Sequence, residues 1–332
     1  MASRPVFSSL GEMLAGATIR EPMTKGIESL SGARFERVVI GGDRFVVKHL
    51  HPDDDWVMRA TGDLRCRPAL LWQAGIFDLL PATIDHAIVA VATGLGRGGL
   101  GAALLLADVS ETLVPDVADP LPEDQHLRFL EHMADLHATC WAIPPHEALC
   151  PAANRAFFLT PWTTTPECGR STNDPVPPLI APGWDRLRRD APAAADLIWE
   201  LLRDPSRLLR PLASLPATLI HGDWKAGNLG SHRDGRTVLL DWAFPGRAPG
   251  PWDLAWYIAV NCDRLPRGPH AKDDAIAAYR ASLARRIDVS GWWQEALGLS
   301  LIAAFCQLGW SKSGDELEWW KVRVADAARF LA

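Results

Sequence analysis

The chain has 332 residues, a length typical of about two domains with hydrophobic cores of their own. Hydrophobic residues make up 48% and charged residues 22%, the proportions of a soluble globular protein, which exclude fibrous and low-complexity classes. The net charge of −6 does not provide the cationic surface that a nucleic acid or an anionic membrane requires, so we expect neither as a partner. A mildly acidic balance instead favours neutral or cationic small molecules as ligands.

The cysteines and the N-terminus indicate the compartment. The six cysteines are far apart, with no CxxC pair and no zinc-like spacing, so we expect reduced thiols. No apolar stretch of signal-peptide length follows the start of the chain. The apolar stretch 87–107 contains Arg97 and five glycines, which disfavour a membrane helix. We therefore predict a cytoplasmic protein.

Short β-branched or alternating segments predict a small antiparallel sheet in the first hundred residues. The strands are expected at 26–30, 34–40, 41–50, 87–92 and 102–107, with turn sequences such as SGA and GGD between the early ones. Residues 53–80 interrupt them with helical spacing that Pro68 breaks into two pieces. The acidic run Asp53–Asp55 is expected to cap the start of this helix.

Amphipathic segments dominate after residue 108 and predict a mostly helical second region. The expected helices are 123–142, 184–203, 251–262, 272–286, 290–309 and 314–331. Residues 144–183 carry nine prolines and show no periodicity. Such a segment is either a lid or substrate-side insert or a meandering surface connection, and the sequence leaves both open.

One segment carries a set of residues suited to phosphoryl transfer. In 219–244, His221, Asp223 and Asn228 lie in one loop, and Asp241 ends the strand that follows. Phosphoryl transfer requires one carboxylate facing the attacking hydroxyl, and a second carboxylate with an amide to hold magnesium at the nucleotide phosphates. A loop that returns as a hairpin would bring these groups into one site.

The spacing resembles the HGDxxxxN loop of the aminoglycoside phosphotransferase and choline kinase family. The later segment GPWDLAWYI is similar to the family segment that carries a structural aspartate, here Asp253. The resemblance extends over about residues 28–260 and implies an α+β, bilobal, protein-kinase-like fold. We expect a nucleotide-binding sheet lobe at 1–106 and a helical catalytic and substrate-binding lobe at 107–332, with residues 144–203 as a substrate-side insert.

The resemblance also implies how ATP, or another nucleoside triphosphate, is bound. Lys48 in the strand FVVKHL would hold the phosphates, the turn with Ser31 and Gly32 would cover them, and the backbone of Ala107 and Val109 would face the base.

Further roles follow for the loop itself. Asp223 would accept the proton of the acceptor hydroxyl, while Asn228 and Asp241 would bind Mg²⁺. Lys225 would either stabilise the transferred phosphoryl group or form an ion pair with Asp223, and His221 would be a buried support of the loop.

One departure from the kinase pattern concerns the partner of Lys48. Kinases of this shape pair the strand lysine with a helix glutamate, yet residues 53–80 contain no glutamate. Asp63 is the nearest acid; another acid could take the role, or the lysine could be held otherwise.

Two further patterns occur in the sequence. Gly94, Gly96 and Gly99 form a GxGxxG sequence, but no Rossmann-type helix and strand follow, so a hairpin turn is expected there. Several C-terminal tryptophans, with acids among Asp263, Asp315 and Glu316, are candidates to line an acceptor pocket; the tryptophans are Trp292, Trp293, Trp310, Trp319 and Trp320.

The sequence thus predicts an ATP- and Mg²⁺-dependent kinase for a hydroxyl group of a small molecule. The first expected acceptor is an aminoglycoside or amino sugar, including antibiotics, so that resistance is an expected role. A neutral sugar, choline or another metabolite is the alternative, and a non-catalytic nucleotide-binding pseudokinase is the alternative of a different class. No oligomeric state follows from the sequence.

Overall fold

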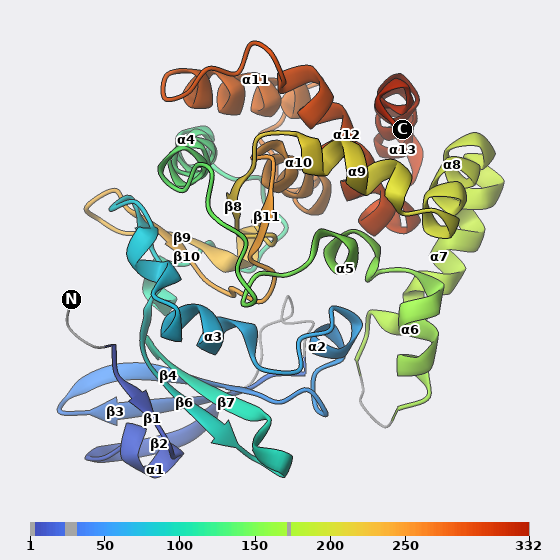
Figure 1. Cartoon of the computed structure of the whole chain (residues 1–332). Coiled ribbons are helices and arrows are strands. Elements are labelled where there is room, and N and C mark those ends of the chain that lie inside the picture. Colours follow the sequence, from blue (N-terminus) through green and yellow to red (C-terminus); the bar gives the residue numbers. More distant parts are fainter. Residues whose placement is uncertain (1–3, 24–31, 171–173, 332) are drawn as a thin grey trace.

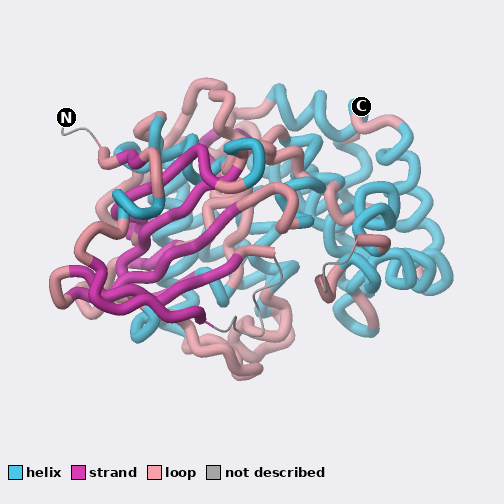
Figure 2. Tube along the Cα trace, turned by 90° about the horizontal axis from the view of Figure 1, so that it is seen from below, coloured by secondary structure: helices cyan, strands magenta, loops and turns pink. Residues whose placement is uncertain are grey.

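A computed structural model describes residues 4–23, 32–170 and 174–331, and the structural statements that follow refer to these residues. The chain forms two lobes (Figure 1), a sheet lobe at the bottom of the view and a larger helical lobe above it. Figure 2, seen from below, shows the strands gathered at one side and the helices filling the other.

The sheet lobe is built on one six-stranded sheet with the strand order β1-β6-β7-β4-β3-β2. Among the described strand pairs of this sheet, only β1–β6 is parallel. The strands are β1 Val6–Phe7, β2 Ala17–Met23, β3 Arg34–Ile40, β4 Asp43–Leu50, β6 Ile88–Leu95 and β7 Gly101–Ala107, with the short helix α1 Leu10–Met13 beside them. The strands expected from 34 to 50 and from 87 to 107 are confirmed, and the glycines at 94–99 form the β6–β7 hairpin turn. The strand expected at 26–30 lies outside the described residues.

The elements α1, β1 and β2 of this lobe were not predicted. Among the described strands, β2 pairs only with β3, and most of its side chains are exposed. Its sequence ATIREPM lacks the apolar alternation of a half-buried strand, so no pattern indicated it.

Strand alternation gives the sheet two different faces. Val47 packs with Met13 and Leu105 in a small core under α1. Lys48, the next residue, points to the opposite face, because successive side chains of a strand alternate. Leu104 on that face belongs to the main core, which continues into the helical lobe.

The helical stretch between β4 and β6 is divided earlier than expected. Helix α2 spans Trp56–Ala60, α3 spans Arg67–Gln73, and a 3₁₀ turn covers Ile76–Leu79. The break lies at residues 61–66, not at Pro68, which occupies the first turn of α3. Proline is tolerated there because an N–H at that position has no partner within the helix.

The helical lobe surrounds two helices that are buried on nearly all sides, α10 Pro251–Val260 and α12 Trp293–Leu308. A helix that is apolar all round belongs in a protein interior. The other helices are α4 Glu123–Thr139, α5 Ala152–Phe157, α6 Pro161–Cys168, α7 Pro177–Asp190, α8 Pro192–Arg203, α9 Ser206–Ser214, α11 Ala271–Ala284 and α13 Gly314–Ala327. None of the helices in the described ranges has both the length and the apolar character needed to cross a bilayer.

One expected helix of this lobe was wrong and several helices were missed. Residues 144–183, in which the sequence shows no periodicity, contain α5, α6 and the start of α7. The helix expected at 184–203 is two helices separated at Ala191, because Pro192 begins α8. Helix α9 was not predicted.

Two small sheets frame the loop at 221–228. The strands β8 Thr218–Ile220 and β11 Gly246–Ala248 pair antiparallel. The strands β9 Leu229–Ser231 and β10 Thr237–Leu239 form a hairpin, and β5 Ile84–Asp85 adds to β10 in parallel. Because β5 precedes the strands β6 and β7, this pairing fastens the two lobes together beside the loop.

Candidate active site

A cavity of about 860 Å³ lies between the lobes. Most residues singled out from the sequence line it, namely Lys48, Ala107, Val109, Asp223, Lys225, Asn228 and Asp241. His221 and Asp253 lie behind its wall and are fully buried. The predicted set, spread over about 200 residues of chain, therefore gathers around one cavity.

The loop that carries Asp223 is held from below by the Asp253 carboxylate at the start of α10. Its oxygens accept the backbone N–H groups of His221 and Gly222, both at 2.7 Å, and the His137 ring nitrogen Nε2 at 3.1 Å. Charge-assisted hydrogen bonds of this kind are about twice as strong as neutral ones. Gly222 has φ +81°, and a Cβ there would overlap the Phe244 carbonyl, so only glycine fits this turn.

His221 contributes to the same loop as a neutral side chain. Burial lowers its pKa, although nearby carboxylates oppose this, and its Nδ1 accepts the Asp223 backbone N–H at 3.1 Å.

Each oxygen of the Asp223 carboxylate receives one hydrogen bond. The indole N–H of Trp256 donates to Oδ1 at 2.9 Å, and the side-chain amide of Asn228 donates to Oδ2 at 2.8 Å. These donors come from α10 and from the loop itself, so the carboxylate plane is fixed from two sides. The Asp223 side chain is 6% exposed and faces the cavity.

Arg155 of α5 forms a second support under this loop. Its guanidinium is buried, and it donates to the Gly222 carbonyl oxygen, from Nε at 3.0 Å, and to the Gln307 side chain. It also lies 4.0 Å from the centre of the Trp256 ring, on which it stacks. Burial lowers the pKa of Arg155 to about 10, so the group remains charged at neutral pH.

Lys48 is paired with Asp241, with 2.7 Å between Nζ and Oδ1. Burial alone would raise the Asp241 pKa, but the charge and hydrogen bond of Lys48, with the charge of Lys225, lower it, so the carboxylate is anionic. Asp241 also has φ +60°, a left-handed conformation that residues with a Cβ rarely adopt. The backbone at the end of β10 is therefore strained where the ion pair forms.

Asp63 does not take the place of the missing glutamate. Both of its oxygens accept the backbone N–H of Arg67, at 3.0 and 2.8 Å, at the start of α3. Another acid of this region, Asp55, lines the same cavity as Lys48. Burial raises the pKa of Asp55, and the positive charge of Lys48 partly offsets this rise. As expected, Asp55 caps α2, accepting the N–H of Val57 at 2.8 Å.

The donor set at Asn228 and Asp241 suits magnesium. No group of three or more histidine, cysteine or acidic side chains in the described ranges is arranged to hold a metal ion by itself. Mg²⁺, however, is usually bound by one or two carboxylates together with substrate phosphates and water. An anionic Asp241 and the amide oxygen of Asn228 facing the same cavity provide such hard oxygen ligands.

The turn expected to cover the phosphates is described only in part, because Ser31 lies outside the described residues. Gly32 packs directly on the chain before α2, where a Cβ would overlap the carbonyl of Asp54. This close approach of two backbones requires glycine.

At its other end the cavity is bounded by α10, by the turn after α12 and by the start of α13. Of the tryptophans and acids proposed for an acceptor pocket, Trp310, Asp263 and Glu316 line it, whereas Trp292, Trp293, Trp319, Trp320 and Asp315 do not. Glu316 is already engaged by Lys272, by Lys312 at 3.5 Å and by the indole N–H of Trp320 at 2.7 Å. Asp263 is exposed.

Two residues of the site were missed in the sequence, Arg155 and Trp256. Arg155 lies in the proline-rich segment whose helices were not expected. Trp256 had a usable signal, because it follows Asp253 by three residues on one helix face.

The chain matches a family described as the phosphotransferase enzyme family over residues 26–288. The chain belongs to this family. The predicted membership and the prediction of a phosphotransferase enzyme are confirmed. None of the curated proteins compared with the chain matches it.

Solved structures share the fold of this phosphotransferase at low sequence identity. The aminoglycoside phosphotransferase APH(3'')-Id from Streptomyces rimosus is 18% identical, with 90% of this chain and 96% of that chain covered and a TM-score of 0.50. A microcompartment-associated aminopropanol kinase is 14% identical, with 96% and 94% covered and a TM-score of 0.51. These similarities confirm the predicted α+β bilobal, kinase-like fold.

Proposed function

We propose that this phosphotransferase catalyses ATP- and Mg²⁺-dependent phosphorylation of a hydroxyl group on a small molecule. The observation that carries the proposal is the placement of Asp223, Asn228, Asp241 and Lys48 on one interlobe cavity, with Lys48 and Asp241 ion-paired. In support, the aminoglycoside phosphotransferase of similar fold has been solved with ADP and streptomycin.

In this proposal each side chain has one task. Lys48 holds the nucleotide phosphates, and Asn228 and Asp241 hold Mg²⁺, which neutralises phosphate charge when bound. The acceptor oxygen attacks the γ-phosphorus, its proton passes to a carboxylate oxygen of Asp223, and ADP leaves. The hydrogen bonds from Trp256 and Asn228 aim the Asp223 carboxylate before the substrate arrives. Lys225, whose charge acts on Asp241, stabilises the transferred group.

The residues at the far end of the cavity support an acceptor with little positive charge. Glu316 is neutralised by two lysines, so the exposed Asp263 and the ring of Trp310 are the groups that could receive an amine. A single-amine acceptor such as an amino sugar fits these groups better than a polycation does. A neutral sugar is the second candidate, because an apolar and aromatic wall also binds sugar faces.

The test is ADP release with ATP and Mg²⁺ across amino sugars, aminoglycosides, neutral sugars, nucleosides and choline, for the wild type beside Asp223→Asn. We expect acceptor-dependent release from the wild type and a loss of about 10²–10⁴-fold in the variant, the usual contribution of a positioned base. Asp234→Asn is the matched control, because Asp234 lies in an exposed turn and, within the described part of the chain, bonds only Arg236.

Two outcomes would contradict the proposal. Equal release from the wild type and Asp223→Asn would remove Asp223 from the reaction. ATP binding without release for any acceptor class would favour the pseudokinase alternative.

A further inference from the structure

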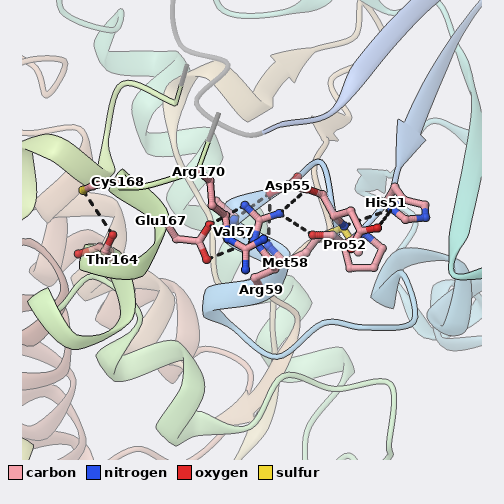
Figure 3. Close-up of polar contacts among 11 residues, drawn as sticks. His51, Pro52, Asp55, Val57, Met58, Arg59, Thr164, Glu167, Cys168 and Arg170 are labelled. Carbon is pink, nitrogen blue, oxygen red and sulfur yellow. Dashed lines mark hydrogen bonds and ion pairs between the residues drawn. The ribbon is translucent and has the colours of Figure 1, made fainter. Parts of the chain in front are cut away.

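An ion pair joins the two lobes at the side of the cavity, between Arg59 of α2 and Glu167 of α6 (Figure 3). The guanidinium Nη2 lies 2.6 Å from Oε2 of Glu167, and Nε lies 3.2 and 3.0 Å from its two oxygens. The side chains are only 12% and 6% exposed. A buried, two-pronged contact of this kind has one preferred geometry, unlike an exposed ion pair.

The same guanidinium also holds the chain that leads into α2. Its Nη1 donates to the carbonyl oxygens of Pro52 at 2.6 Å and Asp53 at 2.7 Å. Figure 3 shows Arg59 reaching Glu167 on one side and this turn on the other. Arg59 therefore links α6 of the helical lobe to the residues just before Asp55.

Asp55 follows this turn directly and lines the cavity. It is 3% exposed and caps α2, and Lys48 lines the same cavity. Helix α2 has only five residues, and a helix so short is not stable by itself. The position of Asp55 relative to Lys48 must therefore be set by tertiary contacts, and Arg59 makes several of them.

We propose that the Arg59–Glu167 pair is a positioning device for the nucleotide end of the cavity. Glu167 of the helical lobe fixes Arg59, Arg59 fixes the turn at Pro52 and Asp53, and this turn holds Asp55 on the wall of the cavity that Lys48 also lines. Lys48 itself is paired with Asp241, so Asp55 supplies a second negative charge on this cavity, held in place from the other lobe. The inference rests on the proposed function, because it assumes that Lys48 holds the nucleotide.

The test measures ATP affinity by calorimetry, KM for ATP and for the acceptor, and the melting temperature. The variants are Glu167→Gln, Asp55→Asn and the double variant. Asparagine at position 55 still caps a helix, so the change removes mainly the negative charge at this position of the cavity wall. We expect each single variant to weaken ATP binding by about 3–10-fold, corresponding to a contact of roughly 1 kcal/mol. KM for the acceptor should stay within 2-fold, and the double variant should be no worse than Asp55→Asn alone.

Two matched controls separate positioning from general stability. Arg170→Gln removes the exposed arginine that lies 3.3 Å from the same carboxylate, and Glu200→Gln removes an exposed ion pair with Arg207. Both should bind ATP like the wild type. Arg59→Lys keeps the charge without the two-pronged geometry and should bind ATP with intermediate affinity.

The outcomes are distinct. A lowered melting temperature with unchanged ATP affinity in Glu167→Gln would make the pair merely structural and overturn the inference, as would additive effects in the double variant. A wild type that binds no ATP would instead overturn the proposed function, and the inference with it.

Discussion

Asp223 and Asp241 face the same cavity, but different kinds of contact hold them. The Asp223 loop is fixed by two residues of α10. Asp253 accepts hydrogen bonds from the loop backbone, and the indole N–H of Trp256 donates to the Asp223 carboxylate. Asp241 is fixed by Lys48, a residue 193 positions away in the other lobe.

The site therefore has two halves. The built-in half is the Asp223 loop with Asp253 and Trp256, all within the helical lobe, and the assembled half is the Lys48–Asp241 pair, which forms between the lobes. The loop keeps its geometry as long as the helical lobe is folded, because its hydrogen bonds lie within that lobe. The geometry at Lys48 depends on how the two lobes meet, through Asp241 and through Arg59 with Glu167. Damage to the first half should therefore affect stability and turnover, and damage to the second should affect nucleotide binding.

The largest effect is expected from removing the support of the built-in half. Asp253→Ala leaves the N–H groups of His221 and Gly222 buried without their acceptor. Each such group costs about 1–3 kcal/mol, so the free energy of unfolding should fall by about 2–6 kcal/mol. Urea denaturation measures this, and Asp253→Asn, which keeps one carbonyl oxygen, should lose less. A variant within 1 kcal/mol of the wild type would show that the loop is not held from below.

The pH dependence of stability should distinguish a buried histidine of the helical lobe from the Lys48–Asp241 ion pair between the lobes. His126, bonded to Tyr257 at 2.8 Å, is buried, which lowers its pKa to about 4. In the unfolded chain a histidine takes up a proton near pH 6.5, whereas the folded protein resists it. Stability is therefore present above pH 6.5 and falls as the pH falls, by about 1.6 kcal/mol between pH 6.5 and 5 for this residue alone. The lowered pKa of Asp241 also stabilises the folded protein, but this contribution is lost only when the pH falls below about 3.8, the ordinary pKa of the group.

Urea denaturation at pH 7, 6 and 5 gives this dependence for the wild type and for His126→Gln. The variant should lose stability less steeply with falling pH, whatever its stability at pH 7. Equal slopes would mean that His126 does not stay neutral in the folded protein.

How much the sequence could predict follows the same division. His221, Asp223, Asn228 and Asp253 lie within 33 residues and are held by contacts among themselves, so their spacing predicted their placement around one loop. Lys48 was predicted from its strand, but its partner was not. Asp241 pairs with it only because the lobes close on each other, and no local pattern encodes that.

The elements missed in the sequence share a physical cause. Helices α5 and α6 are short and begin after or with proline, so neither has the length to show a clear apolar period. Arg155 and Glu167 lie on these helices, and their contacts with Gly222 and Arg59 join residues 67 and 108 positions apart. The supports of the site could therefore not be found from spacing alone.

The smallest effect is expected at Trp256, which belongs to the built-in half and donates one hydrogen bond to the Asp223 carboxylate. Trp256→Phe keeps an aromatic face under Arg155 but removes the N–H that Asp223 Oδ1 accepts at 2.9 Å. One such hydrogen bond to a charged group is worth about 1.5 kcal/mol, so kcat should fall about 10-fold while KM for ATP stays within 2-fold. Steady-state ADP release measures both constants. Because the lost bond aims the Asp223 carboxylate and does not reach Lys48, a rise in KM for ATP without a fall in kcat would mean that the two halves are coupled through α10.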